Sequence, residues 1–161
     1  MKNKICVFDF ETDGKDPYTC SPVQLACVMI DPEKLEIIPN SEFNINLKPE
    51  LLDKNPDHEY EIDLLEFHAK AQKTTATEVL NSWKNFPSQK QSWGQFVNYL
   101  DKYHSRSSRR SMFSAPISAG YNILRFDLPI VDRVAGKYKN VGKDKTNNIF
   151  HPSSVVFIKI V

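Results

Sequence analysis

The sequence predicts an α/β fold in which helices flank one mixed β-sheet. Three observations support this prediction: apolar runs of strand length open the chain, apolar residues at helical spacing follow, and a strand, a helix and a last strand complete the order. At 161 residues the chain is long enough to bury a core and is expected to form one domain, residues 1–161.

The opening strands are predicted from their apolar patterns. Ile5-Cys6-Val7-Phe8 is a continuous apolar run, which is typical of a strand buried on both faces. A second apolar run covers residues 23–30, and shorter ones follow at residues 35–38 and 43–47, so a three-strand meander is expected. Residues 49–59 are polar and contain two prolines, which predicts a loop.

The next segment has the spacing of helices. Ile62, Leu65 and Ala69 mark the apolar face of a first helix. Thr75 and Glu78 have the spacing of a capping box, which predicts that a second helix starts there. Two helices in succession are therefore expected after the loop.

A third helix and the elements after it are predicted in the same way. Ser92 and Gln95 resemble another capping box, followed by apolar residues at helical spacing that include Trp93. This spacing makes Trp93, like Trp83, a core residue rather than a platform for stacking bases. A strand over residues 116–121, a helix over residues 126–135 and a last strand over residues 155–161 complete the pattern.

Composition and cysteine content exclude several classes of protein. No apolar run approaches the roughly 20 residues of a membrane helix, and the N-terminus does not resemble a signal peptide, so a soluble cytoplasmic protein without a membrane partner is expected. The three cysteines Cys6, Cys20 and Cys27 form no CxxC pair. Cys6 and Cys27 sit in apolar runs, which argues for core positions and against disulfides or a zinc site.

The net charge of +1 conceals an uneven distribution. Up to Glu66 the balance is −9, and from Phe67 onward it is +10. Such asymmetry is typical of a protein that holds cations with one part and phosphates with another. A solvated surface on which charges happen to segregate is the alternative, and the same alternative applies to the basic loop that contains Arg106, Arg109 and Arg110.

Asp9 and Glu11 are the first candidates for chemistry. They lie two residues apart at the end of the first strand, so both side chains can project from the same face. Two carboxylates held this close repel each other unless a cation neutralises them, and their oxygens are the ligands that Mg²⁺ prefers. The Asp-x-Glu pattern recurs at Asp31 and Asp57, where polar turns favour solvated charge, so the pattern by itself leaves the metal site open.

A second candidate region follows residues 116–121. Asn122 comes after this strand, and Asp127 falls in the first turn of the next helix. Ends of strands that face starts of helices are where open α/β sheets bind ligands. A structural role remains open for both residues, because Asp stabilises first turns and Asn is common in turns.

Together the two regions resemble a known family. The segment from Phe8 to Gly14, FDFETDG, resembles the first motif of the DEDD 3′–5′ exonucleases, whose members include the proofreading subunits of replicative polymerases. Gly120 to Asp127, GYNILRFD, is similar to their second motif, with the spacing of the single-strand-degrading exonuclease I branch. The resemblance implies a ribonuclease H-like α/β fold, a mixed sheet with flanking helices.

The resemblance also implies roles for individual residues. Asp9, Glu11 and Asp127 would be the catalytic and metal-binding residues, and the complete family site holds two Mg²⁺ or Mn²⁺ ions. The remaining implied site residues would contact the substrate: Thr12, Asp13, Gly14, Asn122 and Arg125. The implied partners are a nucleic acid, DNA rather than RNA, and a polymerase or another replication protein.

The third motif of the family has no counterpart in this sequence. A His or Tyr followed by a fourth Asp is expected on a final helix, and no histidine here is followed by an aspartate at that spacing. The resemblance thus implies a domain that lacks the C-terminal helix and is incomplete at the C-terminus. The expected activity is hydrolysis of DNA from single-stranded or frayed 3′ ends; the alternative is an inactive module that binds nucleic acid or docks on a partner.

Overall fold

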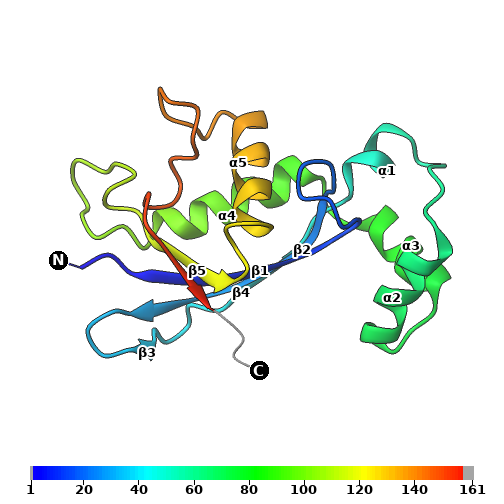
Figure 1. Cartoon of the computed structure of the whole chain (residues 1–161), viewed down its shortest axis with the longest axis horizontal. Coiled ribbons are helices and arrows are strands. Elements are labelled where there is room, and N and C mark those ends of the chain that lie inside the picture. The colour runs from blue at the N-terminus through cyan, green and yellow to red at the C-terminus, as the bar shows by residue number, and fades with distance from the viewer. Residues whose placement is uncertain (1, 158–161) are drawn as a thin grey trace.

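The computed structural model describes residues 2–157, which form a six-stranded mixed sheet with helices (Figure 1). The strand order is β3-β2-β1-β5-β6, and β4 also pairs with β2. β2 runs antiparallel to β1, whereas β5 and β6 run parallel to their neighbours. The strands are β1 (Ile5–Thr12), β2 (Pro22–Asp31), β3 (Glu36–Ile37), β4 (Phe43–Asn46), β5 (Ile117–Tyr121) and β6 (Ser154–Phe157).

The expected three-strand meander is present, with its third strand divided. β3 pairs with the last residues of β2, and β4 pairs with residues 24–27 of the same strand. Both short strands therefore share one edge of β2. Of the last predicted strand, β6 is observed, and residues 158–161 lie outside the described part of the chain.

Five helices complete the described fold and occupy two places. α4 and α5 lie over one face of the sheet, and α1, α2 and α3 gather beside the end of the β1–β2 hairpin (Figure 1). The residues of these last three helices, 50–85, are called the α1–α3 lobe below. The helices are α1 (Glu50–Lys54), α2 (Ile62–Gln72), α3 (Ala76–Asn85), α4 (Gln89–Asp101) and α5 (Asp127–Lys137).

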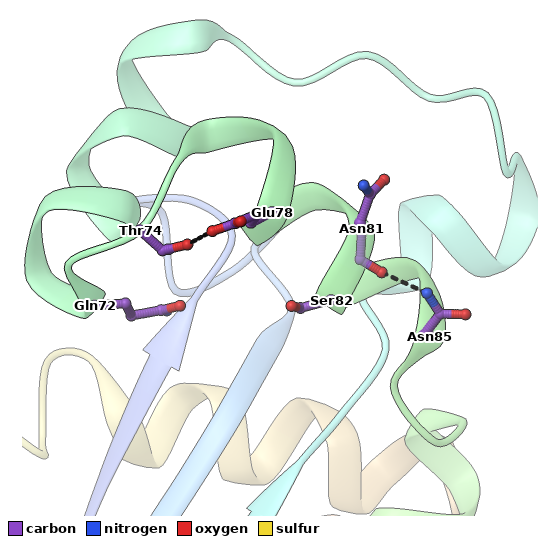
Figure 2. A pocket seen from close by; sticks show the side chains of 6 residues that line it. All are labelled: Gln72, Thr74, Glu78, Asn81, Ser82 and Asn85. Atoms are coloured by element: carbon purple, nitrogen blue, oxygen red, sulfur yellow. Dashed lines mark hydrogen bonds between the residues drawn. The ribbon is translucent and has the colours of Figure 1, made fainter.

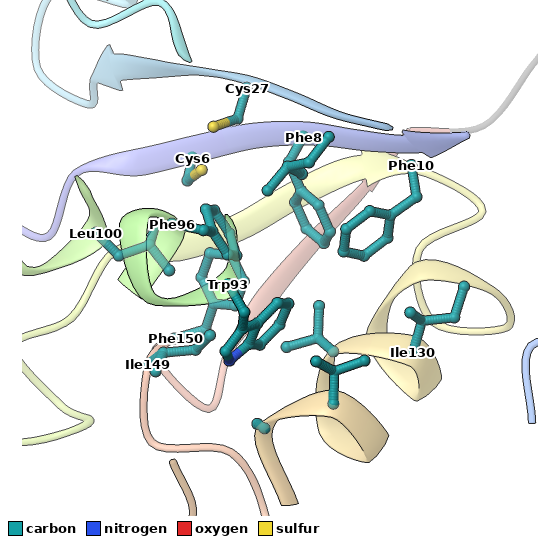
Figure 3. Close-up of a cluster of buried hydrophobic side chains, with 14 of the residues drawn as sticks. Cys6, Phe8, Phe10, Cys27, Trp93, Phe96, Leu100, Ile130, Ile149 and Phe150 are labelled. Carbon is teal, nitrogen blue, oxygen red and sulfur yellow. The ribbon is translucent and has the colours of Figure 1, made fainter. Parts of the chain in front are cut away.

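The main core fills the space between the sheet and the helices α4 and α5. Alternate residues of β1 point into it, namely Cys6, Phe8 and Phe10 (Figure 3). Phe8 stacks on Phe150 at 5.2 Å, and Trp93 packs edge-on against Phe96, so aromatic rings make up much of this core. Trp93 is buried as predicted.

The opposite face of the sheet is open over residues 2–157, so the prediction that β1 is buried on both faces is wrong. Val7 is half-buried and Asp9 is exposed there, and Tyr121 is 62% exposed. The reason is that the described helices cover only one face, so the strand alternates between a buried and an open side.

The α1–α3 lobe has an apolar core of its own. Leu65, Ala69, Val79 and Trp83 pack together there, and Val23 from β2 joins them. The predicted capping box at the start of α3 is confirmed. The Thr75 hydroxyl accepts from the Glu78 amide, and the Glu78 carboxylate accepts from the Thr75 amide. The lobe is therefore a second, smaller packing unit on the same sheet.

Three local predictions need correction. The expected loop at residues 49–59 contains α1, which Pro49 precedes and a Glu50–Lys54 ion pair supports. The predicted capping box at Ser92 and Gln95 is not formed: α4 already starts at Gln89 with Ser88 as its N-cap, and the hydroxyl of Ser92 donates to a backbone carbonyl of β4. Ile62 is 57% exposed, and His68 takes its place on the buried face of α2.

None of the helices formed by residues 2–157 has both the length and the apolar composition needed to cross a membrane. The three cysteines are buried and free, which confirms the predicted core positions of Cys6 and Cys27.

Gly120 brings β5 close to β1. A Cβ atom at this position would lie 2.8 Å from the Phe8 carbonyl oxygen and 2.5 Å from Ile123 Cγ2. Real Cβ atoms do not approach backbone oxygens this closely, so glycine is required here. Gly94 in α4 is the opposite case, because a Cβ there meets no atom within 4 Å.

Replacement of Gly120 by alanine is expected to lower the free energy of unfolding by about 1–3 kcal/mol, because the new methyl group overpacks the contact with β1. Gly94→Ala is the matched control and should raise it by up to about 1 kcal/mol, as alanine favours a helix. Urea unfolding of both variants measures the difference. Equal stabilities would contradict the close approach.

Candidate functional site

Asp9 and Glu11 project from the open face of β1 near its carboxyl end. Both side chains are exposed, while their neighbours Phe8 and Phe10 point into the core, as the period of two of a strand requires. Neighbouring protein atoms still shield each carboxyl from part of the solvent, which raises its pKa, and the charge of Asp9 raises the pKa of Glu11 further. The sheet thus holds two acids side by side.

The pairing of β1 with β5 ends before these acids. The parallel ladder runs from Ile5 opposite Ile117 to Val7 opposite Ala119, and β5 diverges beyond that point. The strand order reverses between β1 and β5, and open α/β sheets bind ligands outside the carboxyl ends of strands at such a point. The divergence leaves the edge of β1 without a strand partner at the acids.

Asp127 fills part of this gap. It lies in the first turn of α5, is 3% exposed, and its Oδ1 accepts a hydrogen bond from the backbone amide of Phe10 at 3.1 Å. Backbone groups that lose a strand partner need another one. Asp127 therefore satisfies the edge of β1 between the two exposed acids.

The three carboxyls act on one another electrostatically. Burial raises the pKa of Asp127 to about 6, opposed by the Phe10 amide and reinforced by the charges of Asp9 and Glu11. Like charges disfavour ionisation in this way only when they are near each other. A cation at this place would relieve the repulsion.

The three acids nevertheless do not form a preformed metal cage. Within residues 2–157, no three His, Cys, Asp or Glu side chains gather closely enough to hold a metal ion. Carboxylate oxygens are the ligands that Mg²⁺ and Mn²⁺ prefer, so the donor chemistry fits such an ion. One oxygen of Asp127 is already occupied by the Phe10 amide.

The residues that follow Glu11 are held firmly. The Thr12 hydroxyl donates to the Gly14 carbonyl at 2.7 Å. Asp13 is buried, and its two oxygens accept from the Ser21 amide at 2.6 Å and from the Tyr60 hydroxyl at 2.7 Å. The side chains of Thr12 and Asp13 are therefore engaged inside the protein.

Two residues of the α1–α3 lobe reach this segment and were missed in the sequence. His68 is buried on α2, and its Nε2 lies 2.8 Å from the Thr12 carbonyl oxygen. Tyr60 bonds to Asp13, and burial together with that bond raises its pKa far above the ordinary value, so it stays protonated. The one signal for His68 was its place beside Leu65 and Ala69 on the apolar face.

The turn between β5 and α5 carries the other predicted contacts. Asn122 is exposed with φ 54°, a left-handed conformation that asparagine tolerates, and its carbonyl accepts from the amides of Arg125 and Phe126. Arg125 is also exposed. Both lie on the segment that joins the gap beside β1 to Asp127.

Arg133 ties α5 to the loop between β1 and β2. Its guanidinium donates to the carbonyls of Pro17, at 3.0 Å, and of Cys20. α5 thus contacts β1 through Asp127 and the loop after β1 through Arg133. Both segments are therefore held in place by the same helix.

One surface groove lies at the candidate site, and another lies on the α1–α3 lobe. A groove of about 590 Å³ on the open sheet face is lined by Asp9 together with Val7, Tyr121 and Phe157, among others. A polar groove on the lobe contains Thr74 and Glu78, which bond to each other (Figure 2). Only the first contains one of the predicted acids.

Comparison with known proteins identifies the fold. No protein-family model matches the chain, and no curated protein matches it. Exonuclease I from E. coli, solved with a 5cy-dT13 oligonucleotide, matches 96% of this chain with a TM-score of 0.58 and 17% identity. A moderately thermophilic exonuclease I from Methylocaldum szegediense matches 96% with a TM-score of 0.59 and 18% identity.

An ExoI/SSB-Ct complex matches 96% of this chain as well, with a TM-score of 0.56 and 17% identity. The chain spans only 28%, 27% and 28% of the lengths of these three structures, in the order given. At such identities the likeness shows the fold alone. It confirms the predicted ribonuclease H-like fold, a mixed sheet with flanking helices.

The raised pKa of Asp127 predicts that Asp127→Asn increases the free energy of unfolding, and that the increase depends on pH. The folded chain binds this proton more tightly than the unfolded chain, whose carboxyl titrates near 3.8, so the wild type loses stability as pH rises from about 4 to 6. The amide keeps an oxygen for Phe10 and carries no charge. We expect it to stabilise the chain by about 1–2 kcal/mol near pH 7.5 and little near pH 4.

Urea unfolding at both pH values measures this gain. Asp132→Asn, at an exposed position of the same helix, is the matched control and should show no comparable change with pH. A gain of equal size at both pH values for Asp127→Asn would contradict the electrostatic cause.

Proposed function

We propose that the chain is a metal-dependent 3′–5′ exonuclease domain of the DEDD type that hydrolyses DNA at single-stranded or frayed ends. The observation that carries the proposal is the pair Asp9 and Glu11 on one face of β1, with Asp127 bonded to the residue between them. The exonuclease I fold supports it.

In this proposal Asp9, Glu11 and Asp127 are the residues that hold Mg²⁺ or Mn²⁺. Two such ions, when bound, supply charge that stabilises an attacking hydroxide and a leaving 3′-oxygen. Asp9 and Glu11 offer all their oxygens to the open face. Asp127 keeps one oxygen on the Phe10 amide and contributes its charge or its other oxygen, directly or through water.

The substrate contacts in this proposal are mostly made by backbone. The side chains of Thr12 and Asp13 are engaged inside the protein, so the peptide groups up to Gly14 would meet the terminal nucleotide. Asn122 and Arg125 are exposed next to Asp127 and would reach a phosphate or sugar of the strand.

The proposed partners follow from the proteins that share the fold. Solved exonuclease I structures include complexes with oligonucleotides and an SSB-Ct complex. We extend this to the chain as a preference for single-stranded DNA and as docking on a polymerase or another replication protein.

A second candidate function is a non-catalytic module that binds nucleic acid or docks on such a partner. Two observations favour it. The described residues contain no cluster of three ligands close enough for a metal ion, and the open face of the sheet exposes Tyr121 and Phe157. Such a module would keep the fold without the reaction.

The test is incubation of the chain with a 5′-labelled single-stranded oligonucleotide and Mg²⁺ or Mn²⁺. We expect a ladder of products that shorten from the 3′ end only when metal is present. An Asp9→Ala/Glu11→Ala variant should lose this activity by at least about 100-fold, because it removes the ligands that neutralise the transition state.

Glu33→Ala/Glu36→Ala is the matched control, because it removes two exposed acids at the turn between β2 and β3, beside the opposite end of β1. An oligonucleotide with a blocked 3′ end should resist degradation. Absence of a product ladder at every metal concentration, with binding of the oligonucleotide retained, would instead support the non-catalytic module.

A further inference from the structure

We propose that His68 and Tyr60 are positioning residues, which hold the end of β1 so that Glu11 stays beside Asp9 on the open face. The inference rests on the proposed function, since it concerns how the same acids are held. In this inference the α1–α3 lobe supports the strand that carries the acids, although none of the three acids comes from the lobe.

The backbone of β1 needs such a partner at Thr12. Strand residues alternate the side to which their amide and carbonyl point, so Phe10 and Thr12 face the same edge. That edge is the one β5 leaves after Val7: the amide of Phe10 donates to Asp127, and the carbonyl of Thr12 accepts from His68 Nε2. Thus side chains from α5 and α2 replace the missing strand.

The direction of this hydrogen bond follows from its acceptor. A carbonyl oxygen can only accept, so Nε2 of His68 carries the hydrogen. The register of β1 against β2 shifts between Glu11 and Thr12, and Thr12 then pairs with Pro22, which has no amide hydrogen to donate. His68 therefore supplies a restraint that the sheet lacks one residue after Glu11.

Tyr60 supplies a second restraint from the same lobe. Its hydroxyl donates to Asp13 at 2.7 Å, and Asp13 in turn accepts from the Ser21 amide. Both lobe residues rest on one indole: the ring of Tyr60 lies 5.3 Å from that of Trp83 and His68 lies 5.1 Å from it, each edge-on. Trp83 is 1% exposed and packed in the core of the lobe, so both rings contact a buried side chain.

The position of His68 is not one that packing alone explains. The face of α2 on which it lies is otherwise formed by Leu65 and Ala69, and the core around it is apolar. A leucine would fill this place without a polar group to satisfy. The imidazole is useful there because it reaches Thr12.

The test compares His68→Gln, which keeps a donor at the end of a side chain of similar reach, with His68→Leu, which does not. The amide of Asp13 shares a peptide group with the Thr12 carbonyl and donates to Ser21. We expect its hydrogen exchange to accelerate about 10-fold in His68→Leu and to stay near the wild-type rate in His68→Gln, with the amides of α5 unchanged in both.

Mn²⁺ titration supplies the functional readout on the same three proteins. His68→Leu should weaken Mn²⁺ binding and metal-dependent hydrolysis by about 10-fold or more, as loss of a residue behind metal ligands does, and His68→Gln should restore both. Tyr60→Phe should weaken binding in the same direction. Tyr138→Phe, which removes a hydroxyl bonded to Gln89 away from the site, is the control.

Several results would overturn the proposal. These are unchanged exchange of the Asp13 amide in His68→Leu, unchanged Mn²⁺ affinity despite faster exchange, or equal damage in His68→Gln and His68→Leu. A wild-type chain that binds Mn²⁺ but degrades no DNA would refute the proposed function alone. A wild-type chain that binds no Mn²⁺ would refute both.

Discussion

The early end of the pairing between β1 and β5 is the constraint on which the candidate site depends. The ladder between the two strands ends at Val7, and after the close contact of Gly120 with Phe8 the left-handed conformation of Asn122 turns the chain away from β1. The free edge of β1 exposes backbone groups that the fold must satisfy. Asp127 accepts the hydrogen bond of the Phe10 amide. This one interaction both stabilises the strand edge and brings a third carboxyl close to Asp9 and Glu11.

The same arrangement opposes stability. An acid that is buried beside two others is held with its pKa near 6, so its ionised form costs free energy at neutral pH. Groups with shifted pKa values occur mostly at functional sites, where they lower the stability of the folded state. The neighbouring restraints are correspondingly strong: Asp13 is bonded on both oxygens, and Arg133 holds the carbonyls of the loop that follows.

Most of the fold could be predicted from the sequence, because apolar periodicity reports local structure directly. The strands, the helices α2 to α5 and the burial of Trp83 and Trp93 follow from it. The open face of β1 did not follow, since burial of the second face depends on which helices cover the sheet. The side-by-side placement of Asp9 and Glu11 could be predicted because they share a strand end. The contact of His68 could not, since its partner Thr12 is 56 residues away and offers only a carbonyl, which every residue has.

The single indole that supports both Tyr60 and His68 has a consequence for how this chain can evolve. A substitution at Trp83 would remove the packing that supports two hydrogen bonds to the strand end at once, so fewer substitutions should be tolerated there than on the outer side of α3. The outer side of the same helix carries polar residues such as Asn81 and Asn85, which line the groove away from the acids. Substitutions on that side would leave the contacts that hold the end of β1 unchanged.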